Sequence, residues 1–88
     1  MKTEFTGRFY KDIDKITQAA VKSDLLAIIQ QVEEAKQIAE IKNIKKLKGH
    51  STAYRIRMGD YRIGVFCEKN VVEFIRIAHR KDIYKIFP

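Results

Sequence analysis

Three arginines in the second half of the chain stand where they can act together. Arg55 and Arg57 alternate with apolar residues, as in a strand with one buried face, so both arginines lie on the other face. Gly59-Asp60 follows as a two-residue turn of the type II′ pattern, which sets Arg62 of the next strand opposite Arg57. Like charges directly opposite one another destabilise a sheet. Because functional sites tend to break such local rules, the pattern predicts an anion-binding site; a solvated basic face with splayed arginines is the alternative.

A second polar group lies near the C-terminus. His79 and Arg80 follow the last apolar stretch, and Tyr84 comes four residues after Arg80. A spacing of four puts Arg80 and Tyr84 on one face of either a helix or an extended segment. Taken singly, Tyr84 is more often a packing residue and His79 an ordinary polar residue at a strand end. Together with the three arginines they form a candidate catalytic set.

This combination suits cleavage of RNA without a metal ion. In that reaction the 2′-hydroxyl attacks the neighbouring phosphate, which gives a cyclic phosphate and a free 5′-hydroxyl. Cations must stabilise the charge around phosphorus, and a base and an acid must move protons. Guanidinium groups grip phosphate oxygens in pairs of hydrogen bonds. The ordinary pKa of histidine, about 6.5, lies nearer to neutral pH than that of tyrosine, about 10, so His79 is better suited to proton transfer than Tyr84. Such a set is chemically weak, so most of the rate would come from positioning the RNA strand in a large host complex such as the ribosome.

Other chemistries find less support in the second half. Its carboxylates are Asp60, Glu68, Glu73 and Asp82. No two of them suggest a two-metal site. Cys67 is the single cysteine, and Ser51 beside His50 matches no nucleophile motif. The sequence therefore predicts no metal site and no cofactor.

The charge distribution favours a polyanionic partner. The 88 residues carry a net charge of +7, and residues 42–88 hold twelve of the 18 Lys and Arg but only four of the 11 Asp and Glu. Clustered cations bind a phosphate backbone by releasing its counterions; a lysine surface that keeps the protein soluble is the alternative. Outside the catalytic set, the residues expected to contact RNA are Lys45, Lys46, Lys48, Arg76 and Lys81.

Hydrophobic periodicity predicts the scaffold that must position these residues. In chain order we expect a strand over 2–5, helices over 8–20 and 21–35, a basic link over 42–49, strands over 54–58, 61–66 and 71–77, and a short helical tail over 81–87. The predicted fold is α+β, a single domain over residues 1–88 in which two N-terminal helices pack on a small antiparallel sheet with a short C-terminal helix. No apolar run approaches the roughly 20 residues that cross a membrane, and no signal peptide is apparent. We therefore expect a cytoplasmic protein.

Three segments together resemble the RelE/ParE toxin superfamily. They are the run Lys46 to Gly49, the run Tyr54 to Ile63 with its Arg-X-Arg-X-Gly-Asp-Tyr-Arg pattern, and the run Ala78 to Tyr84. The resemblance covers essentially the whole chain, because the family also has a short first strand and two helices before its sheet. It implies the RelE-like fold of the microbial ribonuclease type. It also implies a toxin of a type II toxin–antitoxin pair, neutralised by a cognate antitoxin that wraps around it, with a larger toxin–antitoxin assembly left open.

For a RelE-type member, the resemblance implies a metal-independent endoribonuclease that cuts messenger RNA in the ribosomal A site. Arg55 and Arg57 stand where well-studied members carry lysines, while Arg62 and Arg80 match family arginines. Tyr84 stands for the tyrosine of the tail. The chain departs from the family at Arg55 and Arg57, which replace lysines, and in the shorter spacing between Arg80 and Tyr84. Tyr84 and His79 therefore both remain candidates for the general base.

Two further functions stay open at this point. ParE-type relatives share the fold but poison DNA gyrase, and a non-catalytic RNA-binding module would explain the charge alone. RNA cut in translating extracts, DNA breaks trapped with gyrase, or neither outcome would distinguish the three.

Overall fold

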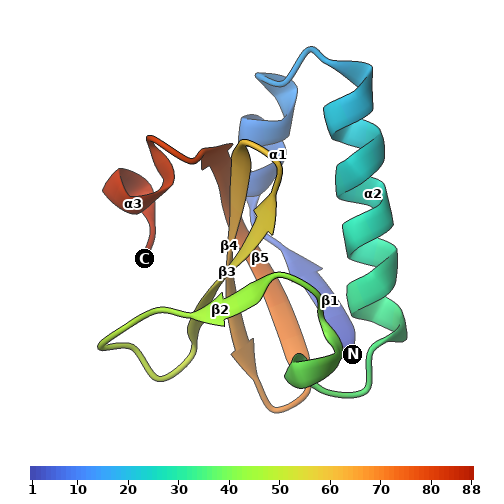
Figure 1. The fold of residues 1–88 in the computed structure, drawn as a ribbon, viewed down its shortest axis with the longest axis vertical. Coiled ribbons are helices and arrows are strands. Elements are labelled where there is room, and N and C mark those ends of the chain that lie inside the picture. Colours follow the sequence, from blue (N-terminus) through green and yellow to red (C-terminus); the bar gives the residue numbers. More distant parts are fainter.

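A five-stranded sheet crosses the molecule, with two helices on one face and a short third helix on the other (Figure 1). This computed structural model describes residues 1–88. Its strands lie in the order β1-β5-β4-β3-β2. In chain order the elements are β1 (Lys2–Phe5), α1 (Gly7–Asp14), α2 (Ala19–Glu34), a 3-10 turn (Ile38–Glu40), β2 (Ile44–Lys46), β3 (Ala53–Met58), β4 (Tyr61–Glu68), β5 (Val71–His79) and α3 (Ile83–Ile86).

The α+β class and the antiparallel meander of β3, β4 and β5 are confirmed. The sheet as a whole is mixed, however, because β1 pairs in parallel with β5, with Lys2 opposite Val71 and Phe5 opposite Phe74. The predicted antiparallel sheet is confirmed for β2 to β5, and β1 adds a parallel strand at its edge. An apolar pattern specifies which face of a strand is buried but not the direction in which the strand runs.

The basic link over 42–49 also differs from expectation, since it contains β2. Ile44 pairs with Ile56 of β3, and Lys46 pairs with Tyr54. A strand of three residues is too short to be recognised by alternation. β2 matters for the site, because it widens the sheet beside the arginines of β3.

The two N-terminal helices divide earlier than predicted. α1 ends at Asp14 and α2 begins at Ala19, so Ile16 is buried in the connection rather than in a helix. Thr6 sets the start of α1, because its hydroxyl oxygen accepts the Phe9 N–H at 3.1 Å. The same hydroxyl donates to the Ile75 carbonyl at 2.8 Å and so ties the start of α1 to β5.

The main core lies between the sheet and the pair α1 and α2. Fourteen buried residues form it, and its largest fully buried side chains include Phe9 and Phe74. The Phe74 ring contacts Phe5 at a centroid distance of 5.1 Å and Phe9 at 5.5 Å. None of the helices is both long enough and apolar enough to span a bilayer.

The opposite face of the sheet has a much smaller core. Its buried hydrophobic side chains are those of Ala53, Ile83 and Phe87. Ile83 and Phe87 come from the C-terminal tail, which Figure 1 shows on the side of the sheet away from α1 and α2. The side chains that pack, partly buried, against these residues are those of Leu47, Phe66, Ile75 and Ala78. The arginines lie on the same face, outside this small core.

Candidate active site

The β3–β4 hairpin has the predicted register. Met58 pairs with Tyr61, and Arg57 stands directly opposite Arg62. Gly59 has φ +57°, and Asp60 is not among the residues with positive φ, as a type II′ turn requires. The turn chemistry and the alternation of β3 therefore bring the expected arginines together on one face.

Asn43 holds the two arginines of β3. Its backbone carbonyl accepts a hydrogen bond from Arg55 Nη1 at 2.9 Å, and its side-chain Oδ1 accepts one from Arg57 Nη2 at 3.4 Å. Asn43 has φ +64°, a left-handed conformation that asparagine tolerates better than most residues. The sequence analysis did not predict this role, because Asn43 lies immediately before a strand that alternation does not reveal.

The hairpin turn orients Arg62. Its Nη1 donates to the carbonyl of Gly59 at 2.7 Å and to that of Tyr61 at 2.9 Å. This leaves the edge formed by Nε and Nη2, one of the edges with which a guanidinium grips an oxyanion through two hydrogen bonds. Arg62 is thus held through Nη1, and its Nε–Nη2 edge is free to bind an oxyanion.

None of these arginines has a carboxylate partner. The ion pairs of the structure are Lys2–Glu4, Arg76–Asp12 and Lys85–Asp82. Arg55, Arg57, Arg62 and Arg80 therefore keep their full charge for a ligand. We call the open surface formed by Arg55, Arg57 and Arg62 the arginine face.

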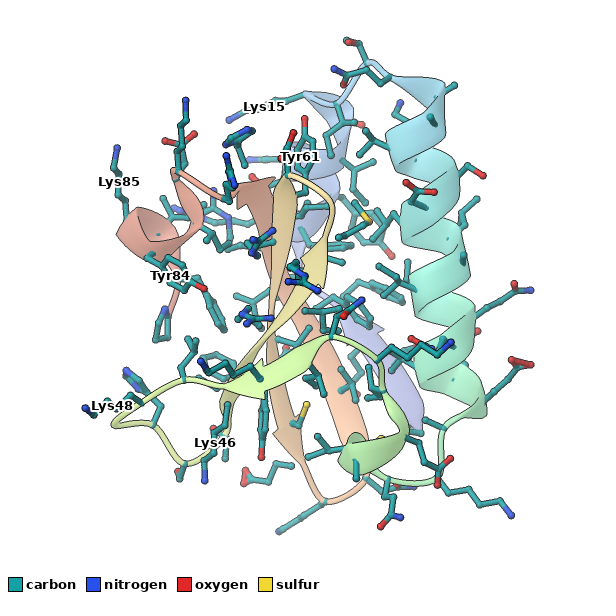
Figure 2. All side chains as sticks on the ribbon, in the orientation of Figure 1. Lys15, Lys46, Lys48, Tyr61, Tyr84 and Lys85 are labelled. Carbon is teal, nitrogen blue, oxygen red and sulfur yellow. The ribbon has the colours of Figure 1, made fainter.

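The C-terminal tail is fastened beside the arginine face at several points. The Arg80 N–H donates to the Asp60 carbonyl at 2.7 Å, so the tail starts against the hairpin turn. Ile83 and Phe87 are buried, while Tyr84 between them is 57% exposed. Figure 2 shows Tyr84 and Lys85 leaving α3 on different sides, with Lys85 pointing away from the sheet. Tyr84 is therefore an exposed side chain on an anchored segment.

Gly64 makes this anchoring possible. It lies on β4 opposite Arg55, and the Phe87 ring covers it so closely that a Cβ there would come within 2.5 Å of the ring atoms. Any side chain at this position would force the ring to move. Gly64 and Phe87 thus help to place Tyr84, a role that the sequence did not reveal because it depends on a contact between distant residues.

His79 lies away from the arginine face. Its ring contacts Tyr61 edge-on at a centroid distance of 6.1 Å, and Tyr61 packs against the main core on the α1 side of the sheet. The His79 Nδ1 accepts the Lys81 N–H at 3.2 Å. The structure therefore brings Arg55, Arg57 and Arg62 together and holds the tail with Arg80 and Tyr84 beside them, but it does not bring His79 to them.

The four lysines expected to contact RNA lie in four different places. Lys45 pairs with Arg55 and extends the arginine face, whereas Lys46 pairs with Tyr54 and so belongs to the other face. Lys48 lies in the β2–β3 loop, which reaches away from the sheet (Figure 2). Lys81 is exposed directly after Arg80.

Arg76 is engaged in the scaffold. Its Nε and Nη2 donate to the two carboxylate oxygens of Asp12 at 2.7 and 3.0 Å, and Asp12 also accepts the Ile77 N–H at 3.0 Å. The hydrogen bond to Asp12 raises the pKa of the Arg76 guanidinium above its usual value. This nearly buried pair joins α1 to β5 beyond the end of β1. We therefore leave Arg76 out of the surface proposed to hold RNA.

Two other kinds of site have no basis in the geometry. Burial raises the pKa of the Cys67 thiol to about 11, so the residue is an uncharged thiol near neutral pH rather than a nucleophile. No three His, Cys, Asp or Glu side chains are grouped so that they could hold a metal ion. The residues that the structure brings together are arginines, with Tyr84 on the neighbouring tail.

Comparison with known proteins places the chain in a family. The model of a family described as the ParE toxin of the type II toxin–antitoxin system parDE matches residues 3–84. Toxin RelE3 of Methanocaldococcus jannaschii is 37% identical over 89 residues, covering all of both chains.

Solved structures agree with that match. The RelB–RelE antitoxin–toxin complex from Methanococcus jannaschii contains a chain that aligns with a TM-score of 0.81 and 34% identity, over 97% of this chain and 99% of that one. The archaeal RelE–RelB complex from Pyrococcus horikoshii OT3 shares the fold at a TM-score of 0.74 and 20% identity, over 93% and 97% of the two chains. The chain therefore belongs to the RelE/ParE superfamily and is a type II toxin of the RelE family.

Proposed function

We propose that this toxin is a metal-independent endoribonuclease that cuts messenger RNA in the ribosomal A site. The observation that carries the proposal is the arginine face, where three guanidinium groups lie together without a carboxylate partner. A tyrosine on an anchored tail lies beside them. Keeping unneutralised like charges together on a sheet costs stability, so a polyanionic ligand gives the arrangement a purpose.

The free edge of Arg62 suits the scissile phosphate. Its Nε and Nη2 would donate to the two non-bridging oxygens, and Arg57 directly opposite would share the charge that develops at phosphorus. Arg55, two residues before Arg57 on β3, and Lys45, opposite Arg55 on β2, would hold a neighbouring phosphate of the same RNA chain. Each guanidinium stays charged at any physiological pH.

Proton transfer would fall to the tail. The 2′-oxygen attacks phosphorus as its proton passes to a base, and the bond from phosphorus to the 5′-oxygen breaks as that oxygen takes a proton. Tyr84 is favoured over His79 as the base, because His79 contacts Tyr61 on the other face of the sheet. A phenol has an ordinary pKa of about 10, so nearby cations would have to favour its ionised form. Such a base is weak alone, which is why a host that positions the RNA is expected to supply most of the rate.

The first experiment compares free with ribosome-bound RNA. The purified toxin should leave naked messenger RNA almost intact and cut the same RNA in programmed ribosomes, with primer extension mapping the new ends. Equal cleavage of both substrates would contradict ribosome dependence. Binding without cleavage of either substrate would instead indicate a non-catalytic RNA-binding module.

A second experiment separates the two candidate bases. Tyr84→Phe keeps the ring and removes the hydroxyl, whereas His79→Asn changes the residue on the other face. We expect Tyr84→Phe to lose most of the cleavage, by at least about tenfold, and His79→Asn to keep it. The reverse result would move proton transfer to His79.

The same arginine face suits a protein inhibitor. Two of the structural relatives were solved as complexes of RelE with RelB. For this chain we propose a cognate antitoxin, acting in the cytoplasm, whose acidic and apolar residues cover the arginine face, alone or in a larger assembly. Co-expression with the adjacent small open reading frame should restore growth to cells that the toxin arrests. A toxin that never slows growth, with or without that partner, would count against the assignment.

Inhibition of DNA gyrase is the second candidate, because the matching family model is described as a ParE toxin. DNA breaks trapped with gyrase in the presence of the toxin, together with intact RNA in programmed ribosomes, would favour it. We place it second because the full-length relative is named RelE.

A further inference from the structure

A second group of free cations lies on α1. Arg8 and Lys11 lie on α1, and Lys15 is the residue that caps its C-terminus. Their spacings of three and four put the three side chains on one side of the helix. All three are exposed, and none has a carboxylate partner among the ion pairs of the structure. At about 1.5 Å per residue they span about 10 Å, about three steps of a stacked nucleic-acid strand at 3.4 Å each. We call this set the α1 stripe.

The stripe borders a shallow hollow of about 220 Å³. Its other lining residues are Asp12 and Arg76, and no apolar residue takes part. Asp12 is the only acid in the lining, and it is already bound to Arg76 through both carboxylate oxygens. The charge of the stripe is therefore not neutralised from within the protein.

A second hollow, of about 330 Å³, continues from the first towards the tail. The two share Asp12, Lys15 and Arg76. The second adds Tyr61 and His79 at the end of the sheet, apolar side chains such as Ile86, and Asp82, which pairs with Lys85. Figure 2 shows Lys15 and Tyr61 at the same end of the molecule. Exposed Arg80 and Lys81 follow His79 directly in the chain. Cations thus lie at both ends of this second hollow, Lys15 next to α1 and Arg80 and Lys81 next to His79.

We propose that the α1 stripe is a second RNA-binding site, one that takes the phosphate backbone of a structured RNA while the arginine face holds the strand to be cut. The residues that line the first hollow favour RNA over an acidic protein as the partner. Protein partners usually anchor on apolar or aromatic side chains at the centre of an interface, and the first hollow has none. Backbone contacts to nucleic acid need only cations and polar groups. The inference rests on the proposed function for the identity of the host RNA, but not for the binding itself.

The test neutralises the stripe and measures RNA binding. The variant carries Arg8→Gln, Lys11→Gln and Lys15→Gln. The matched control carries Lys2→Gln, Lys22→Gln and Lys36→Gln, which are exposed cations of the same half of the chain. Both variants lose the same net charge, so any difference between them reports position rather than total charge. The probes are a 20-base-pair RNA duplex and purified ribosomes, titrated over a range of salt concentrations.

We expect the stripe variant to bind the duplex and the ribosome at least about tenfold more weakly than the control. Its slope of log affinity against log salt should fall by about two to three, since each lost phosphate contact removes about 0.7–0.9. An Arg62→Ala background should show the same loss of slope, because that residue lies on the other face of the sheet. Urea midpoints of all variants should match, which excludes a loss of fold.

The outcomes separate this inference from the proposed function. A wild-type protein that never cuts RNA, but whose duplex binding still depends on the stripe, would refute the nuclease and leave the second site standing. A stripe variant that binds both RNA probes like the control, with an unchanged salt slope, overturns the inference. Loss of antitoxin binding with unchanged RNA binding also overturns it, because it assigns the stripe to an acidic protein.

Discussion

The two faces of the sheet differ in what holds them together. Towards α1 and α2, fourteen buried residues form a continuous core in which the rings of Phe5, Phe9 and Phe74 contact one another. Towards the tail, only three hydrophobic side chains are buried, and the arginines beside them repel one another. Burial of apolar surface is the dominant favourable term in folding. We infer that one face supplies most of the stability and the other is left free to carry charge.

This difference explains how the sheet tolerates Arg57 directly opposite Arg62. An unfavourable cross-strand pair costs at most about 1 kcal/mol, whereas a single fully buried phenylalanine contributes about 1.5–3 kcal/mol. Substitutions on the helix face should therefore reduce stability first, and substitutions on the tail face should reduce activity first. The following predictions test that division.

The largest effect on stability is expected at the centre of the main core. Phe74→Ala removes a fully buried ring that contacts both Phe5 and Phe9. It should lower the free energy of unfolding by about 3–5 kcal/mol, measured by urea denaturation. A loss below about 1 kcal/mol would mean that the helix face is not the stabilising one.

The nearly buried pair of Asp12 and Arg76 should rank next. Asp12→Ala leaves the Arg76 charge and the Ile77 N–H without their partner, and should lower the free energy of unfolding by about 2–3 kcal/mol. Asp14→Ala is the control, because Asp14 is exposed on the same helix and should change stability by less than about 0.5 kcal/mol. Equal effects of the two changes would show that the pair does not join α1 to β5.

Gly64→Ala should separate stability from activity on the tail face. The added Cβ would displace the Phe87 ring and with it the tail, at a cost of about 1–3 kcal/mol. Cleavage in programmed ribosomes should fall at least about tenfold, because Tyr84 loses its support. Gly7→Ala is the matched control, since a Cβ there meets no atom within 4 Å. Cleavage by Gly64→Ala at the level of Gly7→Ala would show that the anchoring of Tyr84 is unimportant.

The smallest effect concerns pH. Burial in the folded protein raises the pKa of the Cys67 thiol from 9.0 to about 11. The unfolded chain therefore loses the thiol proton at a lower pH than the folded protein does. Stability should therefore fall as pH rises from 9 to 11, with a contribution of about 1 kcal/mol at pH 10. Cys67→Ala should lack this component in urea titrations at several pH values. An identical pH dependence of the two proteins would contradict a buried thiol.

The sequence predicts the register of the β3–β4 hairpin correctly, and the reason is local. The type II′ turn and the alternation of β3 determine the pairing of Arg57 with Arg62, and both signals lie within a few residues. The approach of Phe87 to Gly64 depends on a tertiary contact that no local pattern encodes. The contacts of Asn43 with the arginines of β3 could not be predicted either, since β2 is too short to show alternation.

The α1 stripe was hidden for a different reason. A charge count over residues 1–41 is close to neutral, but it mixes the cations of α1 with acids elsewhere, such as Glu33 and Glu34 at the end of α2. Only the spacing of Arg8, Lys11 and Lys15 indicates a shared face. The charge on one side of a helix therefore predicts a binding surface better than the net charge of half the chain does.

The most direct test of the proposed nuclease is Arg62→Ala in programmed ribosomes. Arg62 lies opposite Arg57 and offers a free guanidinium edge to a phosphate. Loss of one such preorganised donor typically slows a reaction by about 100- to 1000-fold. Primer extension should therefore show cleavage by Arg62→Ala reduced by about that factor, with ribosome binding within about threefold of wild type because other cations remain. Lys22 is an exposed residue of α2, so the Lys22→Glu variant serves as the control and should cut normally. If Arg62→Ala cuts the messenger as fast as the wild-type toxin, the arginine face is not the active site.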